Sequence, residues 1–269
     1  MIIKISRKLR VAISLLIIFS TIFAGYFALA HRQQPQAEAS PLSKARYVGF
    51  PKMLFPPIDQ SVVGWWKLND AAGQTVVKDW SASGNTGTSA NNITSATGYT
   101  GVANTAMSFN GTSDWVDLGN ATILNPTTAM TVSIWIKGNS ISAAAFYIGR
   151  DDETDGRAYA VGLLNSRLQL QINGLATINN QGATLTNGVW YHVVAVGDSS
   201  SGWKLYLNGV VDGTAGWVTP NSVVANTNIG RRSYSGSEGY FNGSISDVRI
   251  YNRVLSANEV KGLYIRGRP

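Results

Sequence analysis

The chain has 269 residues, of which 44% are hydrophobic and 14% are charged, and its net charge is +7. Because it contains no cysteine, disulfides, thiolate metal sites and thiol catalysis are excluded. Four of the positive charges lie in the first ten residues, before any acid, so the remainder carries only +3; with no Lys/Arg run interleaved with aromatic residues, nothing indicates nucleic-acid binding.

The first thirty residues have the pattern of a membrane-targeting segment. Residues 11–30 are uncharged and mostly apolar, and as a helix they would span about 30 Å, the thickness of a bilayer core. Ala28-Leu29-Ala30 resembles a secretory cleavage site, but the apolar run is longer than that of an ordinary signal peptide. We favour an uncleaved signal anchor at 1–30 over a cleaved signal peptide. Either would place the chain from residue 31 onward outside the cytoplasm, anchored or secreted.

The rest of the chain is predicted to be a linker and one domain. Residues 31–60 contain most of the prolines and show no sustained apolar period, which predicts a linker. From Ser61 onward, short runs of alternating apolar and polar residues are separated by clusters of Gly, Asn, Asp and Ser, the pattern of antiparallel strands. In the run at 130–137, for example, every second residue is apolar. Ten to thirteen such runs without an internal repeat predict one all-β domain over 61–266.

A helix signal lies near the C-terminus. Ser256 and Glu259 form an S-x-x-E capping box, with the apolar residues Leu255 and Val260 at the flanking staple positions. We therefore expect a short helix that packs back on the sandwich.

The strand before this helix has an irregular rhythm. Ile245 is apolar and so are Val248 and Ile250, a spacing that breaks the two-residue period of a strand. This pattern predicts a β-bulge beside Asp247, and a bulge re-aims the side chain that it carries. The Asp247 carboxylate is expected to point toward the loop at 79–85.

Six segments carry motifs that occur in one order along the chain. They are WKLNDAAGQTVVKDWSASGNTGT (66–88), AMSFNGTSDWVDLG (106–119), TVSIWIKG (131–138), GVWYHVVAV (188–196), KLYLNGV (204–210) and FNGSISDVRIYNRVLSANEVKGLY (241–264). Together they resemble a LamG-like, or laminin-G-like, jelly-roll domain of the concanavalin A-like type. The resemblance implies a two-sheet antiparallel jelly-roll sandwich that binds carbohydrate or protein at a cell surface. It also implies the structural calcium ion that many members hold.

The calcium ligands that the resemblance implies are Asp79, Asn85 and Asp247. The loop from Asp79 to Asn85 resembles the family's Asp-x-Ser-Gly-Asn loop with one additional residue, and Asp247 lies where the family has two successive acids and this chain has Ser246 in place of the first. Alternatively, Asp79 and Asn85 only make side-chain to backbone bonds within a turn. Residues 151–156 hold four acids, and are either a second calcium candidate or an exposed hairpin tip.

Carbohydrate recognition requires aromatic faces beside hydrogen-bonding side chains on loops. The most suitable segment contains Arg231, Tyr234 and Tyr240, and we expect Arg150 and Trp217 as neighbours. The alternative is that these aromatic residues only pack in the core or on a sheet.

The sequence offers no catalytic motif. It lacks the Glu-x-Asp-x-Glu strand that supplies the two carboxylates of related glucanases, and it lacks a nucleophile elbow. His192 lies within a predicted strand and is expected to be structural. We therefore expect a non-catalytic, extracytoplasmic, calcium-stabilised binding module for a glycan or an extracellular protein. The alternatives are a structural or adhesive surface protein without glycan binding, and a relative of the glycoside hydrolases.

Overall fold

The computed structural model describes residues 59–267 except 71, 92, 142, 153–155, 180 and 233–238. The predicted signal anchor at 1–30 and nearly all of the predicted linker at 31–60 lie outside the described residues, as does Tyr234. In the part that is described, no helix has the length and apolar character needed to cross a membrane.

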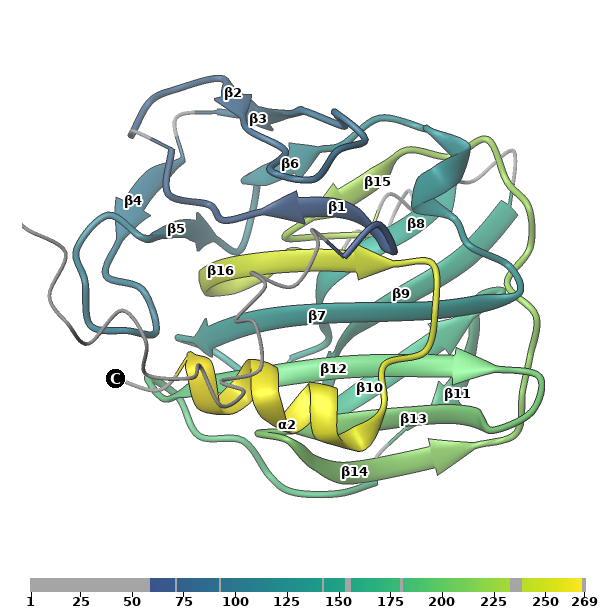
Figure 1. The fold of residues 1–269 in the computed structure, drawn as a ribbon. Helices are drawn as coiled ribbons and strands as arrows, with labels where there is room; N and C mark the ends of the chain where they lie inside the picture. The colour runs from purple at the N-terminus through teal and green to yellow at the C-terminus, as the bar shows by residue number, and fades with distance from the viewer. Residues whose placement is uncertain are drawn as a thin grey trace, which may run out of the picture. The chain divides into compact units, whose positions relative to one another are not determined.

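Two antiparallel sheets of eight strands each, here named sheet A and sheet B, confirm the predicted all-β sandwich (Figure 1). In sheet A the order is β14 (Val210–Ala215), β13 (Gly202–Leu207), β12 (Trp190–Asp198), β7 (Ala129–Gly138), β16 (Asn242–Tyr251), β5 (Ala106–Asn110) and β4 (Thr94–Ala96), and β1 (Val62–Trp66) also pairs with β16. In sheet B the order is β11 (Leu175–Ile178), β10 (Arg167–Ile172), β9 (Gly156–Leu164), β8 (Ala145–Asp152), β15 (Thr227–Ile229), β6 (Trp115–Asp117), β3 (Gly87–Ala90) and β2 (Val76–Val77). The short strands β2, β3 and β4 explain why the described chain has more strands than predicted, since they are too short to show apolar alternation.

One apolar core fills the space between the sheets and confirms the predicted alternation. Its members include Val132, Ile134 and Ile136 from β7 and Leu168, Leu170 and Ile172 from β10. Truncating one such leucine or isoleucine to alanine costs about 2–5 kcal/mol in proteins generally. At the end of β1, Trp66 is fully buried in this core, whereas the adjacent Trp65 is only partly buried, because neighbouring strand residues face opposite sides of a sheet.

Strand β16 contains the predicted bulge. Asp247 has a φ of 50°, and the register of β16 against β7 shifts between Ser246 and Arg249. The bulge lies where β16 changes partner, since β5 pairs with residues 242–245 and β1 with residues 248–251. A positive φ is unfavourable for a residue other than glycine, so the contacts of Asp247 must hold it in place.

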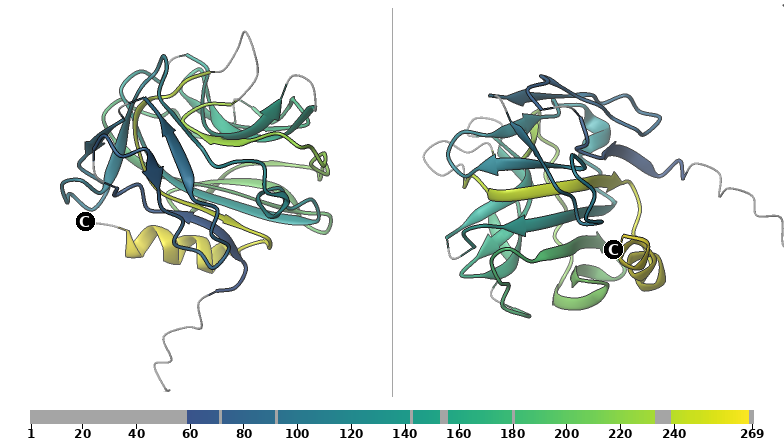
Figure 2. Two further views of the ribbon diagram at one scale, coloured as in Figure 1. Left: turned by 90° about the horizontal axis from the view of Figure 1, so that it is seen from above. Right: turned by 90° about the vertical axis from the view of Figure 1, so that its left-hand side faces the viewer.

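The predicted C-terminal helix is α2 (Ala257–Arg266), which lies along the outer surface of sheet A (Figure 2). Its capping box is present: Ser256 Oγ accepts a hydrogen bond from the backbone N of Glu259 at 3.3 Å, and the backbone N of Ser256 donates to Glu259 Oε2 at 2.8 Å. Leu255 and Val260 are both buried in a second apolar cluster that includes outward-facing residues of β12. This cluster joins α2 to sheet A.

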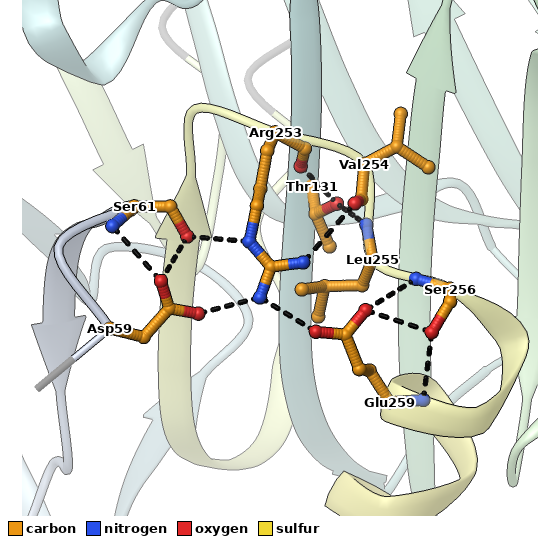
Figure 3. Close-up of polar contacts among 8 residues, drawn as sticks. All are labelled: Asp59, Ser61, Thr131, Arg253, Val254, Leu255, Ser256 and Glu259. Atoms are coloured by element: carbon orange, nitrogen blue, oxygen red, sulfur yellow. Dashed lines mark hydrogen bonds and ion pairs between the residues drawn. The ribbon is translucent and has the colours of Figure 1, made fainter. Parts of the chain in front are cut away.

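Arg253 connects the first described residues to α2 (Figure 3). Its Nη2 donates to Asp59 Oδ2 at 2.6 Å and to Glu259 Oε1 at 2.7 Å, and its Nε donates to Ser61 Oγ at 2.8 Å. The hydrogen bond from Arg253 lowers the pKa of Glu259 to about 2. This network ties the start of α2 to the chain that leads into β1.

Candidate functional site

The bulge in β16 makes Asp247 an anchor for two neighbouring side chains. Its Oδ1 accepts hydrogen bonds from Trp65 Nε1 at 2.6 Å and Arg249 Nε at 3.0 Å, and its Oδ2 accepts from Arg249 Nη2 at 2.8 Å. The Arg249 guanidinium lies 4.5 Å from the centre of the Trp65 ring. Burial opposes the charge of Arg249, but Asp247 outweighs it, so that the pKa of Arg249 lies above its ordinary value. Trp65 and Arg249 are thereby fixed on the outer side of sheet A.

Trp80 extends this surface and is 41% exposed. The Lys67 ammonium lies 3.6 Å from the centre of the Trp80 ring and 4.8 Å from that of Trp65. The Lys78 ammonium lies 4.1 Å from the Trp80 ring. Cations at these distances are attracted to the negative face of an indole ring, which keeps both lysines beside Trp80.

Two hollows adjoin Trp65 and Arg249, which contribute to the walls of both. The larger hollow, about 400 Å³, extends from β1 and β16 to α2. The smaller hollow, about 210 Å³, extends toward Tyr99 and the bulge. Further wall residues of the larger hollow include Trp80, Tyr251, Arg253, Glu259, Leu263 and Arg266. Those of the smaller hollow include Lys67, Asn69, Tyr99, Thr105, Ser246 and Asp247.

Tyr99 gives the smaller hollow a rigid aromatic wall. Its ring stacks on Trp135 at a centroid distance of 4.3 Å and meets the edge of Trp190 at 6.3 Å. Trp135 in turn stacks on Tyr264 of α2 at 5.9 Å. Stacked rings of this kind lose little entropy when a ligand binds, because they are already ordered.

The chemistry of the two hollows suits a flat ligand with many hydroxyl groups. Indole and phenol rings offer apolar faces, while amide, hydroxyl, carboxylate, ammonium and guanidinium groups offer both donors and acceptors. A pocket with apolar walls and a few convergent polar groups is the usual form of a small-molecule site. Because the hollows share Trp65 and Arg249, one extended ligand could occupy both.

The segment predicted to bind glycan forms a separate cluster beside sheet B. Arg231 Nη1 donates to Tyr240 Oη at 3.1 Å, so the structure brings these two predicted residues together. The Arg231 guanidinium also lies 3.8 Å from the centre of the Trp115 ring, a partner that the sequence did not indicate. Arg231 thus contacts both the Trp115 ring and the Tyr240 hydroxyl, and this cluster lines neither of the two hollows on sheet A.

Arg150 and Trp217 do not join that cluster. Arg150 is fully buried, and its guanidinium donates to the carbonyl groups of Asn120, Ala121 and Val223. It therefore holds loops together at the end of the sandwich, and the expectation that it lines a surface is corrected. Trp217 stacks on the core residue Trp203 at 4.9 Å and has neither a ring contact nor a hydrogen bond with Arg231 or Tyr240 in the described structure.

The loop from Asp79 to Asn85 is organised by hydrogen bonds to one carboxylate. Asp79 Oδ1 accepts from the backbone N atoms of Trp65 and Ser81 at 2.9 and 2.8 Å. Its Oδ2 accepts from Ser81 Oγ at 2.9 Å and from the backbone N of Asn85 at 2.7 Å. The Asn85 amide donates to the Val63 carbonyl at 2.9 Å. These are the turn bonds that we gave as the alternative to calcium binding.

As they stand, Asp79, Asn85 and Asp247 do not fit a calcium ion. A carboxylate has about four lone-pair positions, and donors occupy four on Asp79. Asp247 faces the indole and guanidinium described above, not the loop, because β1 separates the two: Trp66 of β1 pairs with Val248 of β16 and bridges to Asp79. Among the described residues, no group of three His, Cys, Asp or Glu side chains could hold a metal ion. Calcium binding stays a prediction from the resemblance.

The second calcium candidate, residues 151–156, is only partly described. Asp151 is buried, and its Oδ2 has no hydrogen-bond partner among the residues that the structure describes. Burial raises the pKa of Asp151 to about 6, although Arg157 and Arg232 oppose the shift. Residues 153–155 lie outside the described part of the chain.

His192 is buried, as expected of a structural histidine. A hydrogen bond of 2.9 Å joins its Nε2 to Ser133 Oγ, and its ring packs beside those of Trp135 and Tyr264, at centroid distances of 5.0 and 6.3 Å. Burial, and then the charge of Arg249, lower the pKa of His192 to about 3. At this position the imidazole is neutral and out of reach of a substrate.

Comparison with solved structures supports the fold at low sequence identity. Domain 4 of a GH43 extracellular arabinanase from Geobacillus stearothermophilus, solved in complex with arabinotriose, is 18% identical, with 76% of this chain and 98% of that chain covered and a TM-score of 0.58. A sialidase from Trypanosoma rangeli is 15% identical over 76% of this chain and 33% of that one, with a TM-score of 0.56. The binding domain of botulinum neurotoxin serotype D/C is 13% identical over 79% of this chain and 53% of that one, with a TM-score of 0.56.

The family of the chain is shown by its sequence as well. No curated protein sequence gives a significant match. The model of one family, described as the concanavalin A-like lectin/glucanases superfamily, matches residues 110–261, which is more than half of the chain. This stretch runs from the end of β5 into α2, and so includes most strands of both sheets. The chain therefore belongs to the concanavalin A-like lectin/glucanases superfamily.

Proposed function

We propose that this protein is a non-catalytic carbohydrate-binding module that acts outside the cytoplasm. The observation that carries the proposal is the pair of hollows joined at Trp65 and Arg249. Aromatic walls with hydroxyl, amide and charged side chains are the groups that recognise sugars. The likeness of the fold to an arabinanase domain in complex with arabinotriose supports the same reading. The extracytoplasmic location rests on the predicted targeting segment at 1–30.

The arrangement of the walls suggests how a glycan would lie. One sugar would occupy the smaller hollow, with its ring against Tyr99 and its hydroxyl groups near Asn69 and Ser246. The next sugar would pass Trp65 and enter the larger hollow beneath Trp80. Binding across both hollows would favour oligosaccharides over single sugars, since each hollow adds contacts.

A glycan array with the full chain tests this proposal. We expect retention of at least one oligosaccharide, and roughly tenfold weaker binding after Trp80→Ala or Asn69→Ala, because each change removes a side chain from one hollow without opening the core. Trp115→Ala on sheet B is the matched control. Loss of binding in Trp115→Ala alone would move the site to the Arg231 cluster, and an array without any retained glycan would overturn the proposal.

A further inference from the structure

We infer that the sugar bound in the two hollows carries an acidic group, a carboxylate or a sulfate. This inference rests on the proposed function and names its ligand class. Its basis is the set of charges in the walls. Three acids line the hollows, and arginine binds each of them: Arg249 pairs with Asp247 at 2.8 Å, and Arg253 pairs with Asp59 at 2.6 Å and with Glu259 at 2.7 Å.

Two cations in the same walls have no acidic partner among the described residues. Lys67 in the smaller hollow and Arg266 in the larger one form no ion pair with any described residue. Outside the hollows, Asp79 is nearby, but its oxygens are occupied by the donors of its own loop. In the smaller hollow Arg249 balances Asp247, so Lys67 leaves one positive charge. In the larger hollow Arg253 faces two acids, and the charge of Arg266 only balances the second of them. The positive charge that remains available to a ligand therefore lies at Lys67.

Lys67 is the better placed of the two. Its ammonium lies 3.6 Å from the centre of the Trp80 ring and 4.8 Å from that of Trp65, and these rings hold its position without neutralising its charge. With a neutral sugar at Trp65, the Lys67 ammonium would have no charged partner and would stay hydrated. An acidic sugar in the same place would contact the indole through its ring and the ammonium through its acid, which adds a charge-assisted hydrogen bond.

The test compares soluble polymers that differ in charge. Affinities of the full chain are measured for polygalacturonate, dextran sulfate and uncharged dextran at low and moderate salt. We expect at least one acidic polymer to bind roughly tenfold or more tightly than dextran, with Lys67→Ala removing most of this preference and Lys67→Arg retaining it. Lys261→Ala is the matched control, since it removes one positive charge from an exposed position of α2 that lines neither hollow.

The outcomes separate this inference from the proposed function. Equal losses in Lys67→Ala and Lys261→Ala would mean attraction to net charge alone and would overturn the inference. Binding of neutral oligosaccharides that is lost in Trp80→Ala but unchanged in Lys67→Ala would also overturn it, while the proposed function would stand. If no carbohydrate bound under any condition, both would fail.

Discussion

Asp247 shows how one strained residue organises a surface. Its left-handed backbone is held by what its carboxylate accepts: the indole N–H of Trp65 and two N–H groups of Arg249. With this backbone conformation, the Asp247 carboxylate faces Trp65 and Arg249 on the outer side of sheet A. Positive φ at a residue other than glycine often marks a functional position, and here it lies in the wall of a hollow.

His192 leads to a prediction about pH. Its pKa is about 3 in the folded chain and 6.5 in the unfolded one, so between these values the unfolded state binds a proton that the folded state does not. Stability therefore falls as pH drops below 6.5. Between pH 7 and 4.5 this one group should lower the free energy of unfolding by about 2 kcal/mol. Urea unfolding of the wild type and of His192→Gln at both pH values measures this loss in the free energy of unfolding.

The test compares the stability of each protein at pH 7 with the stability of the same protein at pH 4.5. His192→Gln keeps a side chain that can bond to Ser133, so we expect it to fold but to be less stable than the wild type at pH 7. Its further loss of stability on going to pH 4.5 should be smaller than that of the wild type. Equal losses in the two proteins would contradict the buried, neutral state of the imidazole.

At the scale of elements, the loop from Asp79 to Asn85 leads to a prediction about calcium. The resemblance predicts that calcium raises the melting temperature. The loop as the structure has it predicts no change with calcium or with a chelator, because hydrogen-bond donors already surround the Asp79 carboxylate. Differential scanning calorimetry with calcium and with EDTA measures this directly.

A matched substitution identifies any calcium site that exists. Asp79→Asn should lower the melting temperature, since the amide cannot accept all four hydrogen bonds, and should do so equally with and without calcium. A calcium-dependent rise that is lost in Asp79→Asn would show that the loop binds the ion after rearrangement. A rise that persists would place the ion elsewhere in the chain.

Elements with a strong local signal were predictable from the sequence. The capping box of Ser256 and Glu259 marked the start of α2, and the broken period around Val248 marked the bulge, because both signals depend on residues a few positions apart. The burial of Arg150 had no such signal. Its partners are carbonyl groups near residues 120 and 223, and a carbonyl has the same chemistry in every residue.

At the scale of the whole molecule, the candidate site could not be read from the chain. Trp65, Tyr99 and Arg249 are far apart in sequence, and they meet because β1 and β5 both pair with β16. The alternation of β1 also leaves open which of its two adjacent tryptophans faces the core. Trp66 does so because of the way β1 pairs with β16 and bridges to Asp79. The hollows that we propose as the ligand surface thus lie on sheet A, whereas the segment favoured from the sequence lies beside sheet B.

The edge strand of sheet A affects the tendency of the protein to aggregate. Strand β14 ends sheet A and exposes Val210 and Val211, and an open edge of this kind invites pairing with another chain. Gln181 covers part of it: the backbone N of Thr214 donates to Gln181 Oε1 at 3.1 Å, and Gln181 Nε2 donates to the Thr214 carbonyl at 3.4 Å. The backbone N of Ala183 also donates to Asp212 Oδ1 at 2.8 Å. One side chain thus takes the place of a neighbouring strand.

Removing that side chain should affect solubility more than stability. Gln181→Ala frees both backbone groups of Thr214, but the two hydrogen bonds are exposed, so we expect a loss of only about 1 kcal/mol in the free energy of unfolding. Light scattering at a temperature well below the unfolding transition should show faster aggregation than in the wild type. Gln74→Ala, at an exposed position whose side chain has no hydrogen bond within the described structure, is the control. Equal aggregation of the two variants would show that β14 is protected by something other than Gln181.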